Sequence, residues 1–245
     1  MLVVSALVLL ATKPAPARAR IPEGVYRPFF ADTSLRSDAG VQAPAPIDVP
    51  SFELDVRQVS QADFLEFVRA NPKWRRSQVA RLFAEGGYLR SWRGDLEPAA
   101  PKSPVTEVSW FAARAYCRWR GARLPTVAEW ERAAEDPKAG ALILEWYSRP
   151  REGALSEAGS GAPNRFGVRG LHGLVWEWVL DFNSNLVADD ARDATRGGGA
   201  QFCGGGATQA VDPNDYATFM RHGFRDSLKA DYTVKDLGFR CARSP

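Results

Sequence analysis

Hydrophobic residues in the first third of the chain fall into short segments with two different periods. Residues Ser51–Val56 place apolar side chains at every second position, which predicts a half-buried strand. Ser60 then stands where a helix N-cap is expected. Three apolar residues follow at helical spacing: Phe64, Phe67 and Val68. The pattern predicts a strand followed by a short amphipathic helix that ends near Asn71.

Two more helices are predicted in close succession further along. The first begins after Ser109, ends near Gly121 and has an apolar face at helical spacing, formed by Ala112, Ala115, Tyr116 and Trp119. The second begins at a capping box, because Thr126 precedes Glu129 by three residues. Pro137 lies beyond its end.

The C-terminal third carries weaker signals. Residues Val175–Val179 resemble a strand, and Leu237–Cys241 predicts a short final strand. Between them, Asp212 supplies an N-cap and Asp215 an acid in the first turn of a helix that includes Tyr216. Helix and strand segments thus follow one another irregularly, which favours an α+β fold.

The N-terminal region predicts export. An apolar run, Leu2–Ala11, precedes the small-residue stretch Ala17-Arg18-Ala19, which resembles a cleavage site, so residues 1–19 are interpreted as a signal peptide. The run is shorter than the roughly 20 residues of a membrane-spanning helix. We expect residues 20–47 to be an irregular N-terminal segment and residues 48–245 to form one domain.

Composition narrows this picture. The chain has 245 residues, 45% of them hydrophobic, which suffices for one sizeable core. Acids and bases nearly balance, with a net charge of +3, so nucleic acid is not a favoured partner. Eight Trp and 21 Gly favour large aromatic anchors and much irregular backbone.

The three cysteines predict one disulfide and one remaining thiol if the protein is exported. Their spacing alone leaves the pairing open. Cys203 lies between two glycine clusters, and it is interpreted either as a reactive thiol or soft-metal ligand, or as a small hydrophobic residue beside a turn. A copper(I) site of Cys203, Met220 and His222 has only the proximity of the last two in its favour.

Three motifs resemble one family. The first block comprises Pro104-Val105, Val108-Ser109-Trp110, Ala115-Tyr116-Cys117, Trp119, Arg123-Leu124-Pro125-Thr126 and Glu129-Trp130; the others are His172–Trp178 and Leu237–Cys241. On these residues the chain is identified as a member of the formylglycine-generating-enzyme, or sulfatase-modifying-factor, superfamily. The resemblance implies an α+β fold related to C-type lectins, with little regular secondary structure.

The resemblance also implies structural sites. Cys117 and Cys241 occupy the positions of a family disulfide, which leaves Cys203 as the free thiol. Gly173, Val175 and Glu177 correspond to calcium ligands, through two backbone carbonyls and one carboxylate. The alternative is that Glu177 receives backbone hydrogen bonds between two buried tryptophans.

The chain departs from the family's best-known members between Gly206 and Arg225. Formylglycine generators carry two copper-binding cysteines here, but the corresponding positions are Asp212 and Ala217. The resemblance therefore excludes that copper chemistry and implies no particular redox metal. In layout the chain is more similar to the pyoverdine-maturation (PvdO-like) and copper-nitrite-reductase-associated members. Ergothioneine-type sulfoxide synthases use three histidine ligands, whereas this chain has two histidines.

Two hypotheses for function remain. The first is an extracytoplasmic maturation factor, an oxidase that modifies a peptide or peptide-derived substrate. Trp176, Arg221 and Arg225 would bind the substrate, and Tyr216, Asp212 or Asp215 would transfer protons. The second is a non-catalytic binding or assembly factor with a periplasmic protein client, because lectin-like scaffolds often serve recognition alone.

Overall fold

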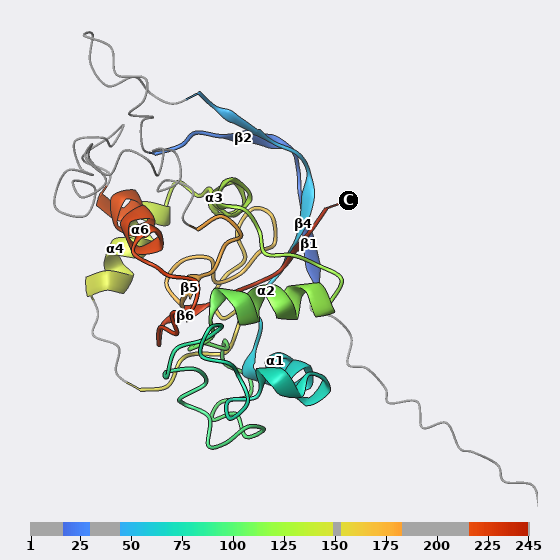
Figure 1. Cartoon of the computed structure of the whole chain (residues 1–245). Helices are drawn as coiled ribbons and strands as arrows, with labels where there is room; N and C mark the ends of the chain where they lie inside the picture. Colours follow the sequence, from blue (N-terminus) through green and yellow to red (C-terminus); the bar gives the residue numbers. More distant parts are fainter. Residues whose placement is uncertain (1–16, 30–44, 149–152, 183–215, 245) are drawn as a thin grey trace, which may run out of the picture.

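A computed structural model describes residues 17–29, 45–148, 153–182 and 216–244 of the chain (Figure 1). Its sheets are small. In the largest, β4 (Phe52–Asp55) lies between β1 (Arg18–Ile21) and β7 (Ala242–Arg243), antiparallel to both. The antiparallel pair β2 (Gly24–Tyr26) and β3 (Ile47–Val49) and the parallel pair β5 (Trp176–Glu177) and β6 (Leu237–Gly238) complete the strands. The family's irregular α+β character is confirmed.

The helices predicted to follow Ser60, Ser109 and Thr126 are present with these residues as their N-caps. In α1 (Gln61–Ala70), Ser60 and Asp63 form a capping box, and Ser109 caps α2 (Trp110–Trp119) by accepting from the amide of Ala112. The capping box of Thr126 and Glu129 begins α3 (Val127–Ala134). The short 3-10 helix η2 (Pro72–Trp74) follows α1.

Two helices lie side by side at one end of the molecule: α4 (Ala139–Ser148) and α6 (Tyr216–Asp226) (Figure 1). The sequence predicted α6, although its expected start at Asp212 lies outside the described residues. It did not predict α4. The sequence of α4, Ala-Gly-Ala-Leu-Ile-Leu-Glu-Trp-Tyr-Ser, has a nearly continuous apolar run and no helical stripe, so periodicity could not identify it.

Residues 20–47 were expected to be irregular, and their described parts, residues 20–29 and 45–47, include strand residues of β1, β2 and β3. Strand β1 pairs in full with β4, and the side chain of Ile21 is completely buried. Arg18 lies 3.2 Å from a carboxylate oxygen of the buried Asp55. Main-chain pairing with β4 and the buried side chain of Ile21 thus hold a segment whose sequence shows no clear hydrophobic period. Strand β1 also begins within the expected signal peptide, so cleavage after Ala19 would remove its first two residues.

An aromatic core joins the first two helices to the C-terminal segment. Tyr116 of α2 packs against Phe64 and Phe67 of α1, with ring centroids 5.8 and 5.7 Å away, and against Phe239 at 5.3 Å. All four side chains are at most 1% exposed. This packing fixes the C-terminal segment, which passes from β6 to β7 and so links two sheets rather than forming the single predicted strand.

The predicted disulfide between Cys117 and Cys241 is present. Both residues are buried, and the bond joins α2 to the segment before β7 across a sequence separation of 124 residues. In the chain-entropy account, closing a loop of this size contributes about 4–5 kcal/mol to stability. In the described part of the chain, no helix combines the length and the apolar character needed to cross a membrane.

Candidate functional site

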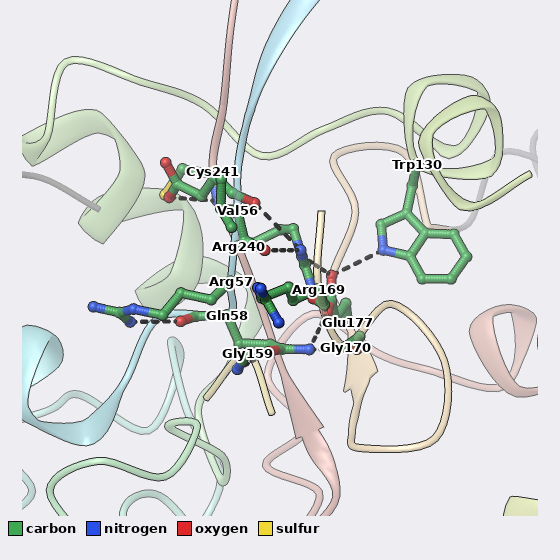
Figure 2. Close-up of polar contacts among 11 residues, drawn as sticks. Val56, Arg57, Gln58, Trp130, Gly159, Arg169, Gly170, Glu177, Arg240 and Cys241 are labelled. Atoms are coloured by element: carbon green, nitrogen blue, oxygen red, sulfur yellow. Dashed lines mark hydrogen bonds and ion pairs between the residues drawn. The ribbon is translucent and has the colours of Figure 1, made fainter. Parts of the chain in front are cut away.

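Glu177 of β5 lies at the centre of a sealed hydrogen-bond network (Figure 2). One carboxylate oxygen accepts from Gln58 Nε2 at 2.9 Å and Arg240 Nη2 at 2.7 Å. The other accepts from Trp130 Nε1 at 2.9 Å and Arg240 Nε at 2.8 Å. The side chains of Glu177 and Arg240 are both 0% exposed. The network therefore contains one buried ion pair supported by two neutral donors.

This arrangement does not fit the calcium site that the resemblance implied. A carboxylate offers about four lone-pair positions, and four donors already use those of Glu177. A calcium ion bound by Glu177 would also lie against the Arg240 guanidinium, and like charges repel. The contacts agree instead with a hydrogen-bonded Glu177, although the donors are side chains rather than the expected backbone amides.

Gln58 also joins Glu177 to two loops, at Gly159 and Gly170. Its amide donates to the carbonyl oxygen of Gly170 at 2.6 Å, and its oxygen accepts from the amide of Gly159 at 3.2 Å. A Cβ atom at Gly170 would come within 3.0 Å of the Gln58 amide, so a longer side chain at this position would displace it. No cluster of three or more metal-ligating His, Cys, Asp or Glu side chains occurs among the described residues.

A second carboxylate, Glu131 of α3, holds the two predicted arginines of α6. Arg221 donates to it twice, through Nε at 2.9 Å and Nη2 at 2.8 Å, and Arg225 donates through Nη1. Burial acts to raise the pKa of Glu131, but the two guanidinium groups outweigh it and hold the pKa well below its ordinary value. Both arginines, predicted as substrate ligands, thus already have a carboxylate partner.

Sequence reasoning assigned no role to Glu131. It directly follows the motif residues Glu129 and Trp130, and its partners lie 90 and 94 positions away in the sequence. The only local signal that could have identified Glu131 was its position beside the apolar face of α3. Trp130 joins the two clusters, because its indole N–H donates to Glu177 and its ring lies 4.6 Å from the guanidinium carbon of Arg225.

Trp176 belongs to an aromatic group built from three elements. Its ring stacks on Phe224 of α6 at 4.7 Å, and Trp146 of α4 meets it edge-on at 5.0 Å. All three side chains are partly exposed. Trp176, Arg221 and Arg225 also line one small cavity, together with Glu177 and Gly173. The structure therefore brings the three predicted substrate-binding residues together.

The predicted proton-transfer residues are only partly described. Tyr216 is 57% exposed in the first turn of α6 and stacks on Phe219 rather than lining this cavity. Ala217, at one of the expected cysteine positions, is buried. Asp212, Asp215 and Cys203 lie outside the described residues, as does one part of the copper(I) site considered above.

The fold and site define a small disulfide-bonded α+β domain with a partly exposed aromatic group beside a buried arginine–carboxylate cluster. A family model for the sulfatase-modifying factor enzyme 1-like domain matches residues 10–245, and the chain belongs to this family.

Curated relatives and a solved structure agree with this assignment. The formylglycine-generating enzyme of Mus musculus is 27% identical over 288 residues, covering 91% of this chain and 73% of the mouse protein. Hercynine oxygenase of Mycolicibacterium smegmatis is 32% identical over 161 residues, covering 54% of this chain and 38% of that enzyme. The structure of PvdO from Pseudomonas aeruginosa matches with a TM-score of 0.53 and 20% identity, covering 94% of this chain and 95% of PvdO, which supports the fold alone.

Proposed function

We propose that this protein is an extracytoplasmic maturation factor, an oxidase that modifies a peptide or peptide-derived substrate at Trp176. The observation that carries the proposal is the partly exposed aromatic group of Trp176, Phe224 and Trp146 beside the Glu131 cluster. Stacked aromatic surfaces bind planar or apolar groups, and nearby guanidinium groups orient acidic ones. Relatives named formylglycine-generating enzyme and hercynine oxygenase make oxidative chemistry the first class of reaction to consider.

The proposed reaction is a two-electron oxidation. The substrate would lose two electrons and two protons, and dioxygen would accept both to give hydrogen peroxide. Trp176, Arg221 and Arg225 would position the substrate, while Tyr216, Asp212 or Asp215 would accept protons. Calcium is not assigned to Glu177, because four donors already occupy its carboxylate.

Export is the second part of the proposal. The apolar run Leu2–Ala11 is typical of a signal peptide, and the buried disulfide between Cys117 and Cys241 favours an oxidising compartment. Cell fractionation should find the protein outside the cytoplasm. Mass spectrometry of the mature chain would locate its N-terminus and should detect Cys203 as the unpaired thiol.

A non-catalytic binding or assembly factor is the second candidate. It is favoured by the contacts of Arg221 and Arg225, which are those of a structural cluster because both guanidinium groups bind Glu131. Such a protein would bind a periplasmic client through the aromatic group without consuming oxygen.

One experiment separates the two candidates. The purified protein is assayed for bound copper, iron and calcium, for binding of candidate periplasmic peptides and dihydro-chromophores, and for oxygen uptake with them. Turnover lost in Trp176→Ala supports the oxidase. Trp119→Ala is the matched control, because Trp119 is 40% exposed on α2, away from the pocket. Binding without oxygen uptake supports the second candidate, and turnover unchanged in Trp176→Ala would refute the placement of the site.

A further inference from the structure

The positive charge of the chain is concentrated in residues 69–120, which run from the last turn of α1 to just beyond α2. This segment holds eleven of the 32 Lys and Arg residues but four of the 29 Asp and Glu residues, a net charge of +7, whereas the whole chain carries +3. Figure 1 shows the loop between α1 and α2 at the opposite end of the molecule from β2. Despite the near balance of the composition, one part of the surface is therefore strongly basic.

These cations are almost all without acidic partners in the part of the chain that the structure describes. Lys102 pairs with Glu157, but none of the other ten forms an ion pair. Three of the four acids of the segment, Glu85, Asp95 and Glu107, accept hydrogen bonds from neutral groups. Seven of the ten cations are exposed: Arg69, Lys73, Arg76, Arg81, Arg90, Arg93 and Arg118. Their charge is thus available to an anionic partner.

Exposed apolar side chains lie among these cations. Leu82 is 77% exposed, more than any other large hydrophobic residue that the structure describes. The next residue, Phe83, is 40% exposed, and its ring lies 5.9 Å from that of Trp74 in η2 and 5.4 Å from that of Phe111 in α2. The exposed leucine is therefore followed by an aromatic residue that joins the loop to two helices.

Cations flank this apolar group. Arg114 and Arg118 follow Phe111 by one and two helical turns, so all three lie on one side of α2. Lys73 directly precedes the first of the aromatic residues, and Arg81 directly precedes the exposed leucine. The result is a basic face with an apolar centre, which comprises Lys73, Arg81, Leu82, Phe83, Phe111, Arg114 and Arg118.

The basic face is separate from the small cavity at Trp176 and from a larger cavity of about 630 Å³. The larger cavity is bounded by residues 25–29, the end of α3, the start of α4 and one side of α6, and no residue of the basic face lines either cavity. Dispersed cations around an exposed apolar residue suit an extended anionic surface better than a small molecule.

A lipid bilayer fits these features better than a protein partner. An anionic bilayer presents phosphate groups across its whole surface and hydrocarbon beneath them, so it can accept separate cations and an exposed leucine together. A protein partner would need carboxylates at matching positions and a pocket shaped for Leu82, because protein interfaces are closely packed at their centre.

We propose that the basic face binds an anionic lipid bilayer, with Leu82 and Phe83 in the headgroup region and the surrounding cations on the phosphates. The proposal goes beyond the oxidase reaction and does not depend on it, because it requires neither oxygen chemistry nor Trp176.

Vesicle sedimentation tests this binding directly. The full-length mature protein is sedimented with vesicles of phosphatidylcholine alone or of phosphatidylcholine mixed with phosphatidylglycerol. We expect it to bind only the anionic vesicles. Raising the ionic strength from about 0.1 M to about 1 M should release it, because the Debye length falls from about 10 Å to about 3 Å. Soluble polyglutamate, which is anionic but has no hydrocarbon layer, serves as the alternative ligand.

A charge variant tests the role of the cations. It carries three changes at exposed positions: Lys73→Gln, Arg81→Gln and Arg118→Gln. Binding should weaken about a hundredfold, at about fivefold for each charge. The matched control removes the same charge from exposed positions outside the segment: Arg20→Gln, Lys138→Gln and Arg243→Gln. We expect the control to bind like the wild type, because the lost charges lie away from the basic face.

A second variant tests the apolar contact. Leu82→Ser should weaken binding at least about tenfold, because this side chain would no longer leave water on binding. Leu142→Ser is the matched control, since Leu142 is 43% exposed on α4, and its binding should not change. Both leucines are exposed, so both variants should keep the wild-type melting temperature.

The outcomes decide the proposal. Losses in both variants with retained binding in both controls support it. Equal binding to neutral vesicles, or equal losses in the variants and their controls, would overturn it. Binding to polyglutamate but to neither kind of vesicle would also overturn it and would assign the basic face to an acidic protein. Vesicle binding retained in Trp176→Ala would support this proposal even where oxygen uptake is absent and the oxidase fails.

Discussion

Glu177 and Glu131 are both carboxylates held by arginine, yet their surroundings differ in the number of guanidinium partners and in access. Glu177 pairs with one guanidinium, and its side chain is 0% exposed. Glu131 pairs with two guanidinium groups, and it borders the 630 Å³ cavity. The sealed cluster stabilises the fold, whereas a cluster that borders a cavity can also contact a ligand.

Trp130 contacts both clusters and so links them. Its N–H serves the structural cluster and its ring lies against Arg225 of the other, so one α3 side chain positions both. The Glu131 cluster therefore rests on a rigid base, which is the usual requirement for a binding site that must not rearrange.

The largest expected effect is at Arg240. Arg240→Met leaves Glu177 buried without its cation and also removes donors to the carbonyl oxygens of Asp55, Val56 and Arg169. Removing one partner of a buried pair typically costs about 3–5 kcal/mol. Urea denaturation should show at least this loss. Adding Glu177→Gln should recover part of it by removing the uncompensated charge, and a loss below that of Arg221→Met would contradict the comparison.

Loss of one arginine at Glu131 should be milder. In Arg221→Met, the carboxylate keeps Arg225, so we expect a loss of about 1.5–3 kcal/mol, the range for hydrogen bonds to charged groups. The same denaturation measurement applies to Arg225→Met, which serves as the reciprocal control. Removing both arginines should cost more than the sum of the single changes, because only then does Glu131 lose both guanidinium partners. A strictly additive result would show that the arginines do not share this carboxylate.

Sequence reasoning predicted interactions between residues close in the sequence and missed those between distant residues. The caps at Ser60, Ser109 and Thr126 were predictable because each hydrogen bond spans three residues. The disulfide came from family resemblance, since spacing alone left the pairing open. Glu177 and Arg240 lie 63 positions apart and Gln58 lies 119 from Glu177, and no local pattern encodes such contacts. The calcium interpretation stays a prediction, and sequence reasoning did not foresee that Gln58 and Arg240 donate to the same carboxylate.

Sequence reasoning predicted several residues of the candidate site but not the contacts that these residues make. Trp176, Arg221 and Arg225 do line one cavity, but their partner Glu131 and the cavity residue His172 had no assigned role. Glu131 lies on α3 and His172 on a loop before β5, so only the folded chain shows that both approach α6.

The stability of the protein should depend on pH through His172, which lines the cavity. The pKa of His172 is lowered in the folded state from its ordinary value of 6.5, so folding favours the neutral ring. This contribution is complete above about pH 6.5 and declines as pH falls below it, because the unfolded chain then binds the proton more readily. His172→Gln keeps a donor for Ala134 without titrating. Its free energy of unfolding should therefore fall less than that of the wild type between pH 7 and 5. Equal slopes would contradict this assignment.

The smallest expected effect is that of calcium on the Glu177 cluster. A ligand that binds only the folded state raises stability in proportion to RT ln(1 + [L]/Kd), so a calcium ion at Glu177 would raise the melting temperature. Because four donors occupy this carboxylate, we expect no difference in melting temperature between 5 mM EDTA and excess calcium, to within about 1 °C. Any shift must then be traced with Glu177→Gln. A calcium-dependent rise that this variant abolishes would show that the ion displaces Arg240 or Gln58, and that the sealed cluster is itself a binding site.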